Sequence, residues 1–166
     1  MDKTNYKKIL LYLFSVIIIF LLDRISKVYV LNLAEIDNLV DIYLTSFLNI
    51  YLIWNNGIAF GLLPLDKALL YNLVTMIIIF INIIILIMII KYNDYRSFFL
   101  IMILGGSMGN LFDRVYFKAV PDFIDVHYND FHWFVFNVAD IFITIGVLCL
   151  ILSELFVNKD LKNEKK

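Results

Sequence analysis

Carboxylate and amide side chains recur in this otherwise apolar sequence, often three residues apart. Asn110 and Asp113 are spaced in this way, as are Asn137 and Asp140, and Asp122 has apolar neighbours in VPDF at 120–123. Two carboxyl groups held close together cannot both ionise, so they share a proton. One member can then activate water as a general base while the other donates a proton. An aspartate pair of this kind could hydrolyse a peptide bond.

Other hydrolytic chemistries have less support in the sequence. Ser107 has no histidine near it, and Cys149, the single cysteine, lies in an aliphatic run. The two histidines, His127 and His132, are five residues apart and match no metal-ligand motif. We therefore expect no metal site and no cofactor.

Further polar residues interrupt apolar runs and need partners. Asp23 and Lys27 are four apart, so they share a helix face and can pair, either as an anchoring ion pair or as part of a site. Asp113 is followed by Arg114, which favours an Asp–Arg network. Asp125 is expected to face water.

The elements that position these residues must lie in a membrane. Apolar residues make up 62% of the 166-residue chain, charged residues 17%, and the mean hydropathy is +0.85. A soluble domain has about 45–50% apolar residues. The net charge of −1, without a basic block before the C-terminal tail, gives nucleic-acid binding no support.

Four segments are long and apolar enough to cross a bilayer as helices, which takes about 20 residues. They run over about 9–31, 68–90, 98–115 and 136–157, with a tail at 158–166. Alternating residues at 41–44 and 47–52 predict short strands. We expect one domain over 1–166, an all-α membrane fold with four transmembrane helices and a small extracytoplasmic sheet between helices 1 and 2.

Basic residues set the orientation of the helices. They are concentrated before the first span, between the second and third spans, and after the fourth, at Lys3, Lys7, Lys8, Lys91, Arg96, Lys159, Lys162, Lys165 and Lys166. Because cytoplasmic loops carry such an excess, both termini are expected in the cytoplasm. The loops at about 32–67 and 116–135 then face outward, and so do most of the polar groups.

Five motifs in order resemble those of the lipoprotein (type II) signal peptidases of bacteria, and the resemblance covers nearly the whole chain. The motifs are DxxxK at 23–27, NNGIAFG at 55–61, GGSMGNLFDR at 105–114, VPDF at 120–123 and FNVAD at 136–140. This sequence departs from the family pattern in two places. Pro121 stands where the family usually has an aliphatic residue, and the proline usually found shortly before the FNxAD motif is missing. Both changes alter the stiffness of the outer loops.

The resemblance implies an aspartyl endopeptidase of the bacterial cytoplasmic membrane, with its active site near the outer face. Its substrates are prolipoproteins whose cysteine carries diacylglycerol, and it cuts on the amino side of that cysteine. Residues 55–61 would belong to an outer sheet that holds the lipidated region of the substrate. The implied catalytic pair is Asp122 and Asp140, with substrate-binding or supporting roles for Asp23, Lys27, Asn55, Asn110, Asp113, Arg114 and Asn137.

Two other classes of protein fit parts of the pattern. A small proton-coupled membrane transporter would use buried charges as a relay, but near the membrane midplane and in two repeated halves. A non-enzymatic assembly subunit would use Gly105 and Gly109 as a docking seam, which leaves Asp122 and Asp140 unexplained. The partners that the resemblance implies are lipid-modified prolipoproteins and membrane lipids. We expect a monomer because a site on one chain suffices.

Overall fold

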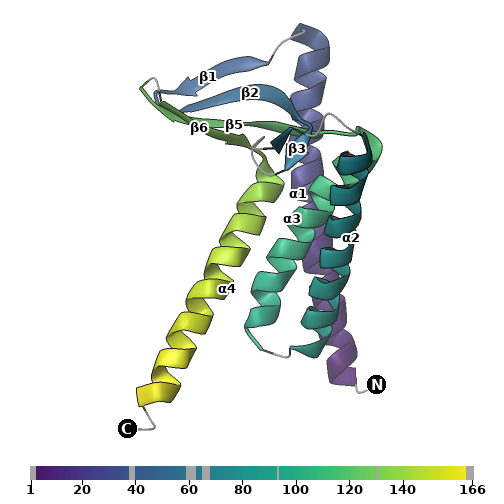
Figure 1. Cartoon of the computed structure of the whole chain (residues 1–166), viewed down its shortest axis with the longest axis vertical. Coiled ribbons are helices and arrows are strands. Elements are labelled where there is room, and N and C mark those ends of the chain that lie inside the picture. Colours follow the sequence, from purple (N-terminus) through teal and green to yellow (C-terminus); the bar gives the residue numbers. More distant parts are fainter. Residues whose placement is uncertain are drawn as a thin grey trace.

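Four long helices form most of the protein, which we describe from a computed structural model. The structure describes all residues except 1–2, 38–39, 59–62, 65–67, 93, 130 and 164–166. The helices are α1 (Lys3–Asp37), α2 (Ala68–Lys91), α3 (Arg96–Tyr116) and α4 (Val138–Asn163) (Figure 1). Each contains a segment long and apolar enough to span a membrane. The four predicted spans are confirmed.

Helix α3 is the centre of the bundle, since it packs against each of the other three helices. Small residues allow this close approach. A Cβ atom on Gly109 would lie 2.5 Å from Asp23 Oδ2 on α1, and one on Gly106 would lie 2.5 Å from the carbonyl oxygen of Ala139 on α4. In a bilayer, where burial of apolar surface drives little association, such backbone contact is a main source of helix packing.

A four-stranded antiparallel sheet covers one end of the bundle (Figure 1). Its order is β1 (Asp41–Thr45), β2 (Leu48–Asn55), β5 (Val120–Tyr128) and β6 (Phe131–Phe136). A separate short ribbon pairs β3 (Gly57–Ile58) with β4 (Leu63–Pro64). The motif predicted over 55–61 begins at the end of β2, and its residues 59–61 lie outside the described part of the chain.

The sheet is larger than predicted, because the segment between α3 and α4 supplies half of its main strands. The sequence predicted a sheet only between helices 1 and 2. Strand β2 would otherwise present an unpaired edge, and β5 covers that edge by pairing with it from Asn55↔Val120 to Leu48↔Val126. This pairing brings two segments that are distant in the sequence to the same place.

The fourth helix differs at both ends from the predicted span at 136–157. The fourth helix begins at Val138 instead of 136, because Phe136 is paired with Ile124 in the sheet. It also continues to Asn163, through most of the predicted tail.

Helix α1 has 35 residues and therefore extends about 50 Å, more than the hydrocarbon core requires.

The extra length of α1 supports the sheet. Val30, near the end of α1, is buried with Val40 and with Phe123 of β5 in a small core. Pro121 of β5 is fully buried opposite Trp54 of β2. Strand β6 pairs with β5 only from Ile124 onward, so Pro121 has a strand on one side alone, where a missing N–H is tolerated.

The arrangement of the termini agrees with the predicted topology of the loops. Figure 1 shows the start of α1, the end of α4 and the α2–α3 connection at the end of the bundle opposite the sheet. Both long connections therefore lie on one side. The orientation of this bundle in the membrane remains a prediction from the basic residues.

Candidate active site

The site lies where the sheet meets the helices, and Asn137 is its link. The Asn137 Nδ2 atom donates to Asp122 Oδ1 at 2.6 Å. The Asn137 backbone N–H donates to Asp140 Oδ2 at 3.1 Å, and the Asp140 N–H donates to Asn137 Oδ1 at 3.2 Å. This reciprocal pair is a capping box at the start of α4. Asn137 therefore precedes the helix, although the predicted span at 136–157 included it.

Asp122 is held by a second amide from the neighbouring strand. Asn55 Nδ2 donates to Asp122 Oδ2 at 2.9 Å, and Asn55 Oδ1 accepts from the Gly57 N–H at 2.9 Å, which fixes the orientation of the amide. Asp122 is 1% exposed. Burial, and secondly the charge of Asp140, raise the pKa of Asp122 to about 7, against the opposing effects of Asn55, Asn137 and Lys27. This carboxyl group therefore holds a proton for part of the time at neutral pH.

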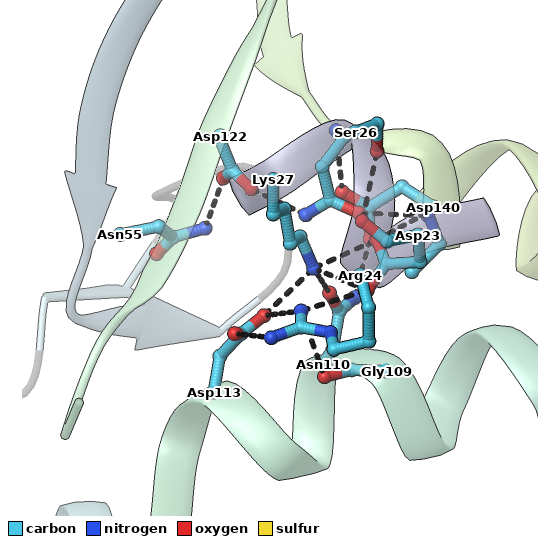
Figure 2. A network of polar contacts seen from close by, with 12 residues as sticks. Asp23, Arg24, Ser26, Lys27, Asn55, Gly109, Asn110, Asp113, Asp122 and Asp140 are labelled. Atoms are coloured by element: carbon cyan, nitrogen blue, oxygen red, sulfur yellow. Dashed lines mark hydrogen bonds and ion pairs between the residues drawn. The ribbon is translucent and has the colours of Figure 1, made fainter. Parts of the chain in front are cut away.

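Lys27 lies at the centre of the charged part of the network (Figure 2). Its ammonium group is fully buried and contacts Asp23 Oδ1 at 2.9 Å, Asn110 Oδ1 at 2.8 Å and Asp113 Oδ2 at 2.7 Å. Asn110 in turn donates from Nδ2 to Asp140 Oδ1 at 2.8 Å. The predicted pairing of Asp23 with Lys27 is confirmed, and Asn110 connects that pair to Asp140.

Arg24 is a member of the network that the sequence analysis did not assign to the site. Its guanidinium group binds both carboxylate oxygens of Asp113, at 2.5 and 2.7 Å, and Asp23 Oδ2 at 2.8 Å. The signal was a basic residue beside Asp23 in an apolar span. Asp23 also accepts a hydrogen bond from the Ala139 N–H at 3.1 Å, which ties α1 to the start of α4.

Arg114 lies at the margin of this network instead of pairing with Asp113. It donates from Nη2 to the Gly57 carbonyl oxygen, and its guanidinium group lies 5.3 Å from the ring centroid of Tyr71. The predicted Asp–Arg network is therefore present at Asp113, but its arginine is Arg24 of α1 and not Arg114. Arg114 instead holds the segment that follows β2.

The charges in the network separate its four carboxyl groups into two kinds. Asp23 and Asp113 are matched by the cations Arg24 and Lys27. The hydrogen bonds described for the other two come from amide side chains and a backbone N–H, as given above. The predicted site residues thus converge in one region, and within it the acids without a bound cation are Asp122 and Asp140.

The comparisons with known proteins agree with this architecture. The family described as Signal peptidase (SPase) II matches residues 15–156. A lipoprotein signal peptidase of Pelagibacter ubique (strain HTCC1062) is 53% identical over 165 residues, which are 99% of each chain. A lipoprotein signal peptidase of Aquifex aeolicus (strain VF5) is 41% identical and aligns over 92% of this chain and 90% of its own.

Two solved structures of bacterial membrane enzymes share the fold of this chain. A bacterial membrane enzyme determined by the in meso method at 2.3 Å resolution has a TM-score of 0.71 and 29% identity, and covers 93% of this chain and 92% of its own. A second bacterial membrane enzyme, solved at 1.9 Å resolution, has a TM-score of 0.68 and 28% identity. The transporter alternative has no support among these relatives. The chain belongs to the signal peptidase II family of bacterial membrane proteases.

Proposed function

We propose that this protein is an aspartic endopeptidase in which Asp122 and Asp140 act as the catalytic pair. Its substrates are prolipoproteins whose cysteine carries diacylglycerol, and it removes the signal peptide by cutting on the amino side of that cysteine. The observation that carries the proposal is the charge balance of the network. Asp122 and Asp140 lie at one site, joined by Asn137, and have amide and N–H partners where Asp23 and Asp113 have cations.

The two carboxyl groups have different surroundings, which suits them to different starting roles. Asp140 lies in the first turn of α4, where the helix dipole favours an anion. Asp122 is buried in the sheet with a pKa of about 7, and we assign the shared proton to it as the starting state. Asp140 then accepts a proton from water, whose oxygen attacks the peptide carbonyl carbon, while Asp122 donates its proton to the carbonyl oxygen.

The second half of the reaction reverses these roles. The proton on Asp140 passes to the leaving nitrogen, the C–N bond breaks, and Asp122 recovers a proton from the tetrahedral intermediate. The products are a signal peptide with a free carboxyl group and a lipidated cysteine with a free amine. The remaining groups serve the pair: Asn55, Asn110 and Asn137 orient it, Lys27 with Asp23 and Asp113 fixes the helices beneath it, and Arg114 holds the chain after β2.

Orientation and substrate access follow from the same proposal. The excess of lysine and arginine at the termini and between α2 and α3 favours a cytoplasmic position for that end, with the sheet and the site near the outer face. A substrate anchored by its lipid and its signal helix arrives already at this depth, and such confinement supplies part of the rate. One chain provides every group, so we propose a monomer.

The test is cleavage of a purified diacylglyceryl-modified precursor by single Asp-to-Asn variants. Asn preserves the shape of the side chain but cannot transfer a proton, so Asp122→Asn and Asp140→Asn should each lose at least about a thousandfold in turnover. The double variant should be little worse than either single one, because the pair acts as a unit.

Two further measurements make the result decisive. Precursor binding should persist in both variants, and Asp41→Asn, an exposed position in β1, should cleave normally. Near-normal cleavage by Asp122→Asn, together with a folded but inactive Asp113→Asn, would reassign the pair to Asp113 and Asp140.

A further inference from the structure

A second cluster of polar side chains lies on the β5–β6 hairpin, apart from the proposed catalytic pair. Asp125 and His127 are two residues apart on β5, and His132 is paired with His127 across the hairpin. The His132 Nδ1 atom lies 2.9 Å from Asp125 Oδ2, and the His127 Nδ1 atom lies 3.7 Å from the same oxygen. One potential ligand atom from each of the three residues lies within 4.8 Å of the others.

The sequence predicted neither this convergence nor the burial of Asp125. Asp125 was expected to face water but is 4% exposed. The five-residue spacing of the histidines matches no ligand motif because the hairpin, not a helix, brings them together. The register of the hairpin shifts between Asp125 and His127, so that the single residue Val126 lies opposite Trp133 and Phe134. Such a bulge redirects side chains and places His132 beside Asp125.

The surroundings of His127 leave one of its nitrogens without a partner. Its side chain is 9% exposed, and Nδ1 is a buried atom with no hydrogen bond. Asn49, paired with Asp125 from the other side on β2, has a buried Oδ1 atom that also lacks a hydrogen-bond partner. A buried polar atom without a partner costs about 1–3 kcal/mol, so these two atoms require an explanation. The hydrogen bond between His132 and Asp125 satisfies neither atom.

We propose that Asp125, His127 and His132 form a binding site for a divalent transition-metal ion, best suited to Zn²⁺. Two imidazole nitrogens and one carboxylate oxygen are a ligand set typical of Zn²⁺ and unlike the all-oxygen sets of Mg²⁺ and Ca²⁺. Zinc bonds of about 2.1 Å in a tetrahedral site separate the ligand atoms by about 3.4 Å. The observed separations of 2.9 and 3.7 Å lie on either side of that value.

The exposure of the three ligands suits a site that is open on one side. His132 is 55% exposed and the other two side chains are buried, so an ion can enter from solvent and retain water as a fourth ligand. Bound metal would give His127 Nδ1 a partner and join β5 to β6. The hairpin connects Asp122 to Asn137, so the ion would stiffen the segment between them without taking part in cleavage.

The test is zinc binding to the full-length protein in detergent, purified without a histidine tag and freed of metal by a chelator that is then removed. Calorimetric titration with Zn²⁺ should give one site per chain with a Kd of about 10 µM or tighter, and Zn²⁺ should raise the unfolding temperature. His132→Gln, at an exposed position, and Asp125→Asn should each weaken binding at least about tenfold. Asp41→Asn removes an exposed carboxylate from the same sheet and should bind as the wild type does.

The visible spectrum of bound Co²⁺ provides a second measurement, since nitrogen ligation gives bands that the hydrated ion lacks. These bands should be present in the wild type and in Asp41→Asn and absent in His132→Gln. The proposal would be overturned if titration to about 100 µM metal gave neither heat with Zn²⁺ nor absorption bands with Co²⁺. Equal zinc affinity in the wild type and in His132→Gln would also overturn it. Neither outcome depends on which residues cleave the precursor.

Discussion

Replacing Asp122 with asparagine should make the stability of this protein less dependent on pH. In the folded state burial and the charge of Asp140 raise the pKa of Asp122 to about 7 from its ordinary value of 3.8. Between these two pH values the folded protein holds a proton that the unfolded chain has released. The free energy of unfolding therefore falls as the pH rises through this range, and this contribution is lost above about pH 7. Asparagine does not titrate, so this part of the pH dependence disappears.

The magnitude follows from the two pKa values and from the hydrogen bonds of the carboxylate. The two pKa values differ by about 3 units, and each unit corresponds to about 1.4 kcal/mol. The free energy of unfolding of the wild type should therefore fall by about 4 kcal/mol between pH 4 and pH 8. Asparagine at 122 also places an amide NH₂ against the NH₂ group of Asn55 or Asn137, both of which are oriented by other bonds. An unpaired buried donor costs about 1–3 kcal/mol. Asp122→Asn should therefore be less stable than the wild type by about 1–3 kcal/mol at pH 4 and more stable by a similar amount at pH 8.

Thermal unfolding in detergent micelles over pH 4–8 measures this difference. Tryptophan fluorescence is suitable because Trp54 and Trp133 both lie in the sheet that carries Asp122. For a chain of this length about 1 kcal/mol corresponds to about 2–4 °C, so the two curves should cross and separate by several degrees at either end. Asp41→Asn, at an exposed position in β1, should follow the wild-type curve. Asp140→Asn should move the titration of Asp122 to lower pH, because the charge of Asp140 contributes to the raised pKa.

One result would refute the reasoning. If Asp122→Asn were less stable than the wild type by the same margin at pH 5 and pH 8, Asp122 would have the same ionisation in the folded and unfolded states. The proton that the proposed mechanism assigns to Asp122 would then have no support.

Two other predictions concern the helices beneath the site. Gly109→Ala should lower the free energy of unfolding by about 1–3 kcal/mol, because the added Cβ would lie 2.5 Å from Asp23 Oδ2 and must push α1 away from α3. Thermal unfolding measures this loss, and Met108→Ala, at an exposed position, is the control. Asp113→Asn should lower the free energy of unfolding by about 3–5 kcal/mol, because two buried cations, Arg24 and Lys27, then share the single carboxylate of Asp23. A lower yield and a lower unfolding temperature would show this, and wild-type stability would contradict a structural role for Asp113.

The sequence predicted the helices well because one physical requirement dominates them. In lipid each backbone group must be satisfied within its own segment, so a long apolar run forms a helix whatever its intrinsic propensity. The predicted span at 68–90 is Ala68–Lys91 in the structure, and the span at 98–115 is Arg96–Tyr116. The contact between Asp23 and Lys27 was predictable for the same reason, since four residues on a helix bring side chains together.

The sheet and its polar clusters were less predictable because they depend on pairing between distant segments. Asn55 and Asp122 are 67 residues apart and meet only because β5 covers the edge of β2. The hairpin bulge that brings His132 to Asp125 depends on register, and a one-residue change in register reverses the face of every side chain. Residue spacing carries no information about either event.

The capping box at the start of α4 connects the sheet to the helices. Asn137 ends the sheet, begins α4, and contacts both Asp122 and Asp140. The N-terminus of α4 is also fixed from beneath, where Asp23 accepts from the Ala139 N–H and is itself held by Lys27. The distance between the two carboxyl groups is thus set by one amide side chain and by a helix whose first turn is anchored to α1. A residue that serves only as a helix cap would not need a side-chain NH₂ group directed at Asp122, which is why asparagine, and not serine or aspartate, suits position 137.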